Sequence, residues 1–403
     1  MSGIAAQTRV THVNRKYDPN VAMDDVLTPI FRFLPTEALD KCSAADITDL
    51  VWAYRGGGTG IGAYVSVAAG GVPPWTREEM LARVEVVMEA RKTLARLRAI
   101  PYIPQRSDEW FNMRKQRLTA SDAAQAIGKG KYGTRAMLVK KKVNEGLGIQ
   151  TPFKSSPPTQ WGVMFEPMAS RAYSQHREGV TLHEFGLLAH PELTCFGASP
   201  DNVSEMGVMV EYKCPYKRAI TGDIPFEYQV QMQGQMAVCA LTECDYVECG
   251  MERIMSAEAY IERLSGHRRH HGVILEWAAP SGSDAFCGGY DYSDADMLPE
   301  EAAEWAKRTI RESAPRRVQA IIYWRLKVLH ITRVYFKPAF WNDLVPQIIG
   351  FWDDVVRGRE EAIAAGPVAI ATTAAAAGGG AGGAGAEKQN GKKYSFLEDS
   401  DAD

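Results

Sequence analysis

The fold of this chain is decided by residues 199–213, which read SPDNVSEMGVMVEYK. Residues 208–213 alternate between apolar and polar side chains and predict a β-strand, so Glu211 and Lys213 project from the same face. The polar, glycine-containing segment before them predicts a turn that folds the preceding strand end back beside this strand. We therefore expect a hairpin that brings Asp201 alongside Glu211 and Lys213.

This hairpin predicts a metal site. Two carboxylates held together repel each other unless a cation lies between them, and their hard oxygen ligands suit Mg²⁺, with Mn²⁺ as a substitute. A lysine beside such a cation can orient a water whose pKa the metal lowers, which is the chemistry of phosphodiester hydrolysis. The pattern by itself is weak. Its plain alternative is a surface hairpin with a Glu–Lys pair.

The hairpin belongs to a series of six motifs that favours the catalytic interpretation. In chain order they are Gln105-Arg106-Ser-Asp-Glu-Trp110 with Arg114, Leu118-Thr-Ala-Ser121, Trp161-Gly-Val-Met-Phe-Glu166-Pro-Met-Ala169, Gly197-Ala-Ser-Pro-Asp201, Glu211-Tyr-Lys-Cys-Pro215 and Tyr228-Gln-Val-Gln231. This series resembles the lambda-exonuclease, or YqaJ-type viral recombinase, family of PD-(D/E)xK nucleases. The resemblance covers about residues 105–250 and extends loosely to about 358.

The resemblance implies an α/β fold with a restriction-endonuclease-like core, in which a mixed β-sheet is flanked by helices. It also implies that Asp201, Glu211 and the backbone carbonyl of Tyr212 bind the metal, and that Lys213 attends the attacking water. Glu166, on a helix, would reach the metal through water, and the helical Gln231 would hold water or the scissile region. The alternatives are that Glu166 merely starts a helix before a proline, and that Gln231 is an exposed helix residue.

Three more residues match family positions that grip a 5′-terminal phosphate: Arg114, Ser121 and Ser199. A guanidinium pairs well with phosphate, and residues 119–121 are expected to open a helix whose N-terminal amides bind anions. The alternative for Arg114 is a solvated arginine. Residues 101–145 carry ten basic against four acidic side chains, or +6, in a chain of net charge −3. This local excess suits a DNA surface, although a merely solubilising face has the same composition.

Length and composition predict two or three units in the 403 residues, 45% of which are hydrophobic. We expect a helical accessory region over 1–100, a nuclease domain over 101–365 with 251–316 partly an insertion, and an Ala/Gly tether with an acidic tail over 366–403. No apolar run is long enough to cross a membrane, and residues 1–10 lack a secretory signal. Seven cysteines in such a chain favour reduced thiols.

Periodicity and turn signals predict several elements outside the hairpin. The expected helices are Asp24–Leu39, Ala44–Tyr54, a helix opened by a capping box at Thr76, Glu301–Arg311 and Phe340–Val356. The expected strands are Ile321–Leu329 and Ile331–Phe336, and Ser281–Ser293 is expected to be an insertion loop.

Three features are interpreted as structural rather than catalytic. The glycine cluster 56–62 lacks the Lys-Ser/Thr of a phosphate loop and predicts a flexible turn. Cys239, Cys244 and Cys249 have no CxxC spacing and predict buried thiols rather than zinc. The histidine-rich segment 267–271 predicts a basic loop, with a metal site as its alternative.

The resemblance implies a Mg²⁺-dependent 5′→3′ exonuclease that degrades double-stranded DNA from its ends and leaves 3′ single strands for recombination. The alternatives are a structure-selective or nicking endonuclease on the same core, and a non-catalytic DNA-end-binding factor. The expected partners are duplex DNA ends and a single-strand annealing or single-strand-binding protein. Some relatives form trimers, so a homo-oligomer is also expected. The resemblance places the chain in the cytoplasm or nucleus of an infected cell, not outside it.

Overall fold

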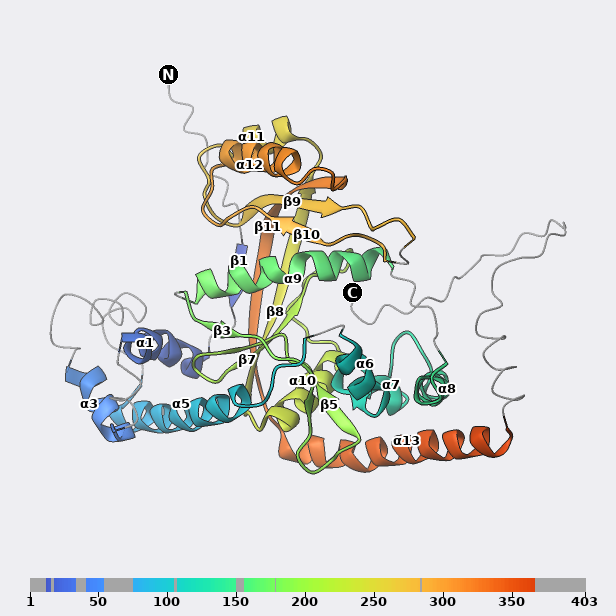
Figure 1. The fold of residues 1–403 in the computed structure, drawn as a ribbon. Helices are drawn as coiled ribbons and strands as arrows, with labels where there is room; N and C mark the ends of the chain where they lie inside the picture. The colour runs from blue at the N-terminus through green and yellow to red at the C-terminus, as the bar shows by residue number, and fades with distance from the viewer. Residues whose placement is uncertain are drawn as a thin grey trace, which may run out of the picture.

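A mixed sheet of eight strands forms the centre of the protein (Figure 1). The computed structural model describes residues 12–15, 18–33, 41–53, 75–104, 107–149, 156–177, 179–282 and 285–366. The strand order is β10-β9-β11-β8-β7-β6-β3, and β1 pairs with β11 off this path. The strands are β1 His12–Arg15, β3 Leu182–His183, β6 Asn202–Ser204, β7 Met209–Lys213, β8 Glu243–Ile254, β9 His271–Trp277, β10 Tyr290–Tyr292 and β11 Val318–Tyr335.

The sheet is mixed because β7 pairs with β8 in parallel, as β1 does with β11, whereas the other neighbours are antiparallel. A second, three-stranded sheet has the order β2-β5-β4 and lies beside the first. Its strands are β2 Leu118–Thr119, β4 Leu188–Ala189 and β5 Phe196–Ala198. The predicted class, a mixed sheet flanked by helices, is confirmed.

Helices cover both faces of the large sheet (Figure 1). Helix α9 crosses one face, with α1, α3 and α5 at its side, whereas α10 and α13 pack against the other, next to α6, α7 and α8. The helices are α1 Pro19–Phe33, α3 Ala44–Ala53, α5 Arg77–Arg98, α6 Asp108–Lys115, α7 Ala123–Ala126, α8 Arg135–Gly146, α9 Pro157–His176, α10 Phe226–Cys239, α11 Ala257–Leu264, α12 Pro299–Glu312 and α13 Pro338–Ala364. A 3₁₀ turn, η2 Ala120–Asp122, precedes α7.

Most predicted helices are present, and their ends follow local chemistry. The capping box at Thr76 is confirmed, because its hydroxyl accepts from the Glu79 N–H while the Glu79 carboxylate accepts from the Thr76 N–H. Helix α5 ends at Arg98, ahead of Pro101. The helices predicted over 301–311 and 340–356 are also present, each somewhat longer. Helix α1 begins at Pro19, five residues before the predicted start, and residues 34–40 lie outside the described residues.

Two predictions for the second half of the chain were wrong. The expected pair of strands is one strand, β11, which continues through His330 with a register irregularity between Leu326 and Val328. It pairs with β8 over Tyr323–Tyr335, and this long antiparallel partner supplies hydrogen bonds across the expected break. The loop predicted over 281–293 contains β10, because Tyr290–Tyr292 pairs with β9.

Residues 255–317 form a lobe at the far end of the long strands, which we call the upper lobe (Figure 1). Helices α11 and α12 pack there on β9 around a small core that includes Tyr260, Trp277 and Ala302. Strands β9 and β10 of this region belong to the central sheet.

The N-terminal helices share a hydrophobic core with α9 and the central sheet. A fully buried charge network joins them: Arg83 of α5 pairs with Asp24 of α1 and Glu243 of β8, and Arg333 of β11 pairs with Asp245, Glu243 and Asp24. These residues lie far apart in sequence, so the network forms only when the helices dock on the sheet.

No helix in the described ranges has the length and apolar character needed to span a membrane. The glycine cluster 56–62 and residues 367–403, with almost all of the predicted tether and the tail, lie outside the described residues.

Candidate active site

The predicted hairpin is present and holds two carboxylates together. Strands β6 and β7 pair with Asn202 opposite Val210, so extending this register by one residue sets Asp201 opposite Glu211. The hairpin is tighter than expected, because β6 itself occupies the first half of the predicted turn. The Asp201 carboxylate accepts a hydrogen bond from the Tyr212 backbone N–H at 2.8 Å, which fixes it against the end of β7.

Glu211 is almost completely buried, and three side chains hold its carboxylate. Gln231 donates to Oε1 at 2.7 Å, Gln235 donates to Oε2 at 2.8 Å, and the Lys213 ammonium lies 2.9 Å from Oε1. The sequence analysis missed Gln235. The available signal was its spacing, since residues four apart share one face of a helix. Gln231 thus contacts Glu211 itself, rather than only water or the scissile region.

Lys213 is fixed from two sides. Its ammonium pairs with Glu211 and lies 4.6 Å from the centre of the Tyr228 ring, within cation–π range. The next strand places Glu248, also fully buried, beside Lys213 in the register of β7 and β8. Arg218 and the Tyr246 hydroxyl donate to Glu248, so this second carboxylate has partners other than Lys213.

The electrostatics of Asp201 fit a divalent cation. Burial raises the pKa of its carboxyl well above the usual range, and the nearby charges of Glu211 and Glu166 raise this pKa further, against the lowering effects of Lys213 and the Tyr212 N–H. Glu166 is exposed on α9. Carboxylates that repel one another in a buried site form a donor set that a hard divalent cation satisfies.

Asp201 and Glu211 form the centre of this donor set. Across the described ranges, no group of three or more His, Cys, Asp or Glu side chains converges closely enough to hold a metal ion.

The three residues expected to bind a terminal phosphate lie on neighbouring segments. Strand β2 pairs in parallel with β5, with Thr119 opposite Gly197, and Ser121 and Ser199 each lie just beyond the C-terminal end of one of these two strands. The Ser121 side chain is exposed. The Ser199 hydroxyl is buried, and it has no hydrogen-bond partner among the described residues. Ser199 is also two residues before Asp201, which connects these positions to the carboxylate pair.

Arg114 lies in the last turn of α6, half-buried. Its guanidinium is 4.6 Å from the Trp110 ring and 4.0 Å from the Asp122 carboxylate. Residues 119–121 open a helical segment as expected, but a short one: Thr119 is the N-cap of a 3₁₀ turn at Ala120–Asp122, which is followed by the four-residue α7. A segment this short provides no helix-dipole site, so a phosphate here would depend on side chains.

The basic surface is smaller than the charge count predicted. Lys142 is buried, where it donates to the Arg114 carbonyl and to Glu145, and Arg135 pairs with Asp354 of α13. Arg106 lies outside the described residues. The exposed cations of this region are Lys129, Lys131 and Lys140.

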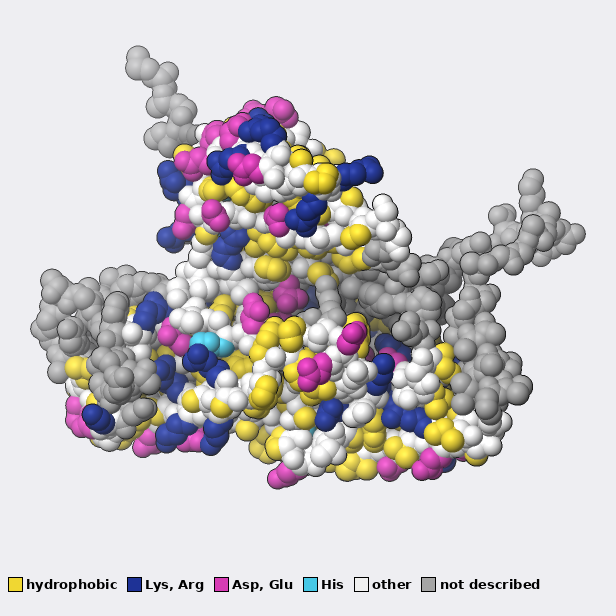
Figure 2. Space-filling model, viewed as in Figure 1, with side chains coloured by type: hydrophobic (Ala, Val, Ile, Leu, Met, Phe, Trp, Pro, Cys, Tyr) yellow, Lys and Arg dark blue, Asp and Glu magenta, His cyan; other side chains and the backbone are white. Residues whose placement is uncertain are grey.

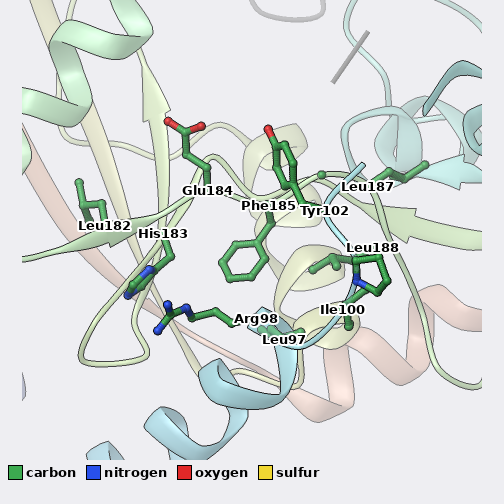
Figure 3. Close-up of a pocket in the computed structure, with 12 residues that line it drawn as sticks. Leu97, Arg98, Ile100, Tyr102, Leu182, His183, Glu184, Phe185, Leu187 and Leu188 are labelled. Atoms are coloured by element: carbon green, nitrogen blue, oxygen red, sulfur yellow. The ribbon is translucent and has the colours of Figure 1, made fainter. Parts of the chain in front are cut away.

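A recess of about 440 Å³ lies between the end of α5 and the β3–β4 segment (Figure 3). It is lined by Arg98, Tyr102, His183, Phe185 and apolar neighbours, and the His183 and Arg98 side chains point to the same side. None of the predicted catalytic residues lines it.

The thiols of Cys239, Cys244 and Cys249 are buried, as predicted. His271 is held between the Tyr260 hydroxyl at 2.7 Å and the His267 carbonyl at 3.0 Å, and the His267 ring contacts the Leu264 carbonyl. These contacts give the two histidines roles in the packing of the upper lobe.

Comparison with known proteins shows what the part of the chain around this site is similar to. Residues 109–245 match the YqaJ-like viral recombinase domain, a range that contains Asp201, Glu211 and Lys213. The chain is 25% identical over 306 residues to uncharacterized protein R354 of Acanthamoeba polyphaga mimivirus. The alignment covers 66% of this chain and 55% of the relative, so the chain spans about half the length of the curated relative it matches.

Two exonuclease structures are similar in part. The alkaline exonuclease LHK-Exo from Laribacter hongkongensis is 21% identical, with a TM-score of 0.40, over 63% of this chain and 95% of that one. A phage-related exonuclease from Haemophilus somnus 129PT is 14% identical, with a TM-score of 0.34, over 63% and 98%. The match over residues 109–245 confirms the resemblance predicted from the motifs: this part of the chain is similar to the YqaJ-like viral recombinase domain.

Proposed function

We propose that this protein is a Mg²⁺-dependent nuclease that degrades double-stranded DNA from 5′ ends and leaves 3′ single strands. One observation carries the proposal: Asp201 and Glu211 face each other within a YqaJ-like domain, with Lys213 paired to Glu211. Two carboxylates beside a positioned ammonium are suited to hydrolysing a phosphodiester. The packing of the fold gives no reason for these two carboxylates to lie together.

Asp201, Glu211 and the Tyr212 carbonyl would hold the Mg²⁺, for which Mn²⁺ would substitute. The bound cation would lower the pKa of a water and neutralise charge on the phosphate. Lys213 would donate a hydrogen bond to the attacking water and hold it for in-line attack. Gln231 and Gln235 keep the Glu211 carboxylate in one orientation, so the donor atoms need little rearrangement when a cation arrives.

Recognition of a 5′ end would depend on Arg114, Ser121 and Ser199. The Arg114 fork can pair with a phosphate, and the unpartnered Ser199 hydroxyl is a donor close to Asp201 in sequence. A terminal phosphate held there would fix the distance from the DNA end to the carboxylates and so favour cutting from ends.

The test uses linear and closed-circular duplex DNA, the linear form carrying either a 5′-phosphate or a 5′-hydroxyl, in Mg²⁺. We expect Mg²⁺-dependent loss of linear DNA, faster from 5′-phosphate ends, with the circle intact. Rapid cutting of the circle would identify an endonuclease instead. Binding to ends without hydrolysis in Mg²⁺ or Mn²⁺ would identify a non-catalytic end-binding factor.

The proposal also covers the proteins that would act together with this one and the cellular compartment in which it would act. The exposed 3′ strand requires an annealing or single-strand-binding protein, and ring-shaped trimers would explain processive digestion. The similarity to a mimivirus protein supports action inside an infected cell, in its cytoplasm or nucleus.

A further inference from the structure

A shallow recess separates α9 from the upper lobe, and its lining is rich in cations. Arg171 of α9 lines it together with Arg268, Arg269 and His270 of the lobe, and Asp296 is the one acidic residue in the lining. Three guanidiniums against one carboxylate give the recess a positive potential. An anion is therefore the kind of ligand that the recess would attract.

The cation on the helix side lacks a carboxylate partner. Arg171 is half-buried, and it donates to the Ser293 carbonyl at 3.0 Å and contacts the Met168 sulfur. Within the described part of the chain, no ion pair joins it to an acidic side chain. Burial lowers the pKa of Arg171, against the raising effects of the nearby charges of Asp294 and Asp296.

Two buried nitrogens of the recess also have no hydrogen-bond partner among the described residues. They are Nε1 of Trp324, which is only 4% exposed, and Nδ1 of His270. Leaving a buried polar nitrogen unpaired costs on the order of 1–3 kcal/mol. The Trp324 indole can only donate a hydrogen bond, so an anionic or acceptor ligand suits it.

The backbone around the recess is strained. The described non-glycine residues with positive φ are Ala240, His270 and Asp296, and the last two line this recess, at 64° and 63°. Such conformations are disfavoured and tend to occur at ligand sites. The two loops that meet at the recess therefore hold conformations that local sequence alone does not favour.

The recess lies near the carboxylates, at the contact between α9 and the upper lobe. Arg171 follows Glu166 by five residues on α9, about 7.5 Å along the axis, and its side chain leaves the helix about 140° away from that of Glu166. Burial raises the pKa of the Tyr292 hydroxyl of the lobe, and Glu166 lies close enough for its charge to raise this pKa further. The lobe follows the same helix, since the Tyr292 hydroxyl donates to the Met164 carbonyl and Ser293 accepts from Arg171. Figure 2 shows a hollow between the lobe and the body below it, in which Asp and Glu side chains gather.

We propose that this recess binds a backbone phosphate of the DNA strand whose scissile phosphate lies at Asp201 and Glu211. The inference rests on the proposed function for its ligand, a phosphodiester in DNA, and assigns to the upper lobe the second wall of the DNA path. Arg268 and Arg269 lie at the mouth of the recess with side chains 58% and 66% exposed. There they pair with Glu301 at 4.0 Å and with Asp296 at 3.3 Å, so a bound phosphate would compete with these two carboxylates for their guanidiniums. Arg171 and the buried Trp324 side chain complete the lining.

The test compares the double variant Arg268→Ala/Arg269→Ala with Arg308→Ala/Arg311→Ala, which removes the same charge from exposed positions of α12 in the same lobe. Binding of a fluorescently labelled short duplex is measured by anisotropy, without divalent metal, over a series of salt concentrations. We expect the first variant to bind roughly tenfold more weakly, because it loses a phosphate contact. The slope of its log binding constant against log salt concentration should become shallower by about one. The α12 variant should retain the wild-type slope.

A second measurement locates the contact. Duplexes with a single neutral methylphosphonate at successive positions should bind the wild type more weakly at one position near the end, and the Arg268→Ala/Arg269→Ala variant should not respond there. Equal salt slopes in both variants, or a methylphosphonate response that survives in the first, would overturn the phosphate site. Wild-type protein that shows this binding pattern but no Mg²⁺-dependent hydrolysis would overturn the proposed function and leave the site standing.

Discussion

At the residue scale, the facing pair Asp201 and Glu211 and the neighbouring Lys213 have separable roles. Asp201→Ala should lose Mn²⁺ binding and nearly all Mg²⁺-dependent hydrolysis, because one carboxylate is a poor site for a divalent cation. Lys213→Ala should still bind metal and DNA, but should hydrolyse about 10²–10³ times more slowly, since one preorganised donor is lost. Single-turnover rates and Mn²⁺ titration check both. Near-normal activity in Asp201→Ala, judged against the exposed-site control Asp223→Ala, would show the assignment to be wrong.

Gln235 provides a second test at this scale. Gln235→Leu removes the donor to Glu211 Oε2 and leaves the carboxylate held at Oε1 alone, by Gln231 and Lys213. We expect weaker Mn²⁺ binding and a lower kcat at saturating metal, with the folded structure retained. Gln229→Leu is the matched control, because Gln229 lies on the same helix and donates to the Ile224 carbonyl instead. If the two variants have equal metal affinity, Gln235 serves the packing of α10 only.

At the scale of elements, the segment from α6 to α8 presents Arg114. Helix α8 holds α6 from behind, since buried Lys142 donates to the Arg114 carbonyl at 3.1 Å. Arg114→Ala should erase the preference for 5′-phosphate over 5′-hydroxyl ends while leaving the slow rate on 5′-hydroxyl ends intact. Degradation rates on the two matched duplexes measure this. Lys140→Ala, an exposed cation of α8, should keep the preference, and its loss there would point to general charge instead.

The next prediction concerns the C-terminal segment and rests on its sequence. Residues 387–403 combine Tyr394, Phe396 and Leu397 with a run of acidic residues, behind an Ala/Gly stretch. Such a segment is typical of a tethered partner motif, although a disordered solubilising end has the same composition. Deleting 387–403 should preserve hydrolysis of naked DNA and weaken co-purification with a single-strand-binding partner. A lower rate on naked DNA would mean that the tail acts on the catalytic domain.

At the scale of the whole molecule, the buried charge network makes stability depend on pH. Burial alone would raise the pKa values of Asp24 and Asp245, but the charges of Arg83, Arg333 and Arg177 outweigh it and hold both carboxyls below their ordinary range. Carboxyls with depressed pKa values stabilise the folded state above their unfolded pKa of about 3.9, and this stabilisation is lost as the pH falls below it.

The prediction is a free energy of unfolding that declines as the pH falls from about 5 toward 2. Asp24→Asn should be less stable at pH 7 by about 3–5 kcal/mol, because it leaves buried Arg83 and Arg333 with fewer partners. It should also lose less stability on acidification than the wild type. Urea unfolding at several pH values measures both, and parallel curves for the two proteins would contradict the role given to Asp24.

The features that could be predicted from the sequence are those that depend on residues close together in the chain. The hairpin of Asp201 and Glu211 was predicted from a strand pattern and a turn within fifteen residues. The capping box of α5 was predicted from a pattern of four residues. Both are contacts between near neighbours in the chain, so their geometry is set by backbone preferences that the residues themselves carry. The ordered motifs likewise sufficed to predict the family and the fold class.

The tertiary structure alone decided the contacts that join distant segments. Only the packing of α10 on β7 shows that Gln235 holds Glu211, and only the α6–α8 contact removes Lys142 from the basic surface. The pairing of Asp24 with Arg333 spans 309 positions, and the recess of Arg171 and Arg268 needs α9 and the upper lobe together. Such contacts depend on how every intervening element packs, and no short pattern in the sequence encodes that arrangement.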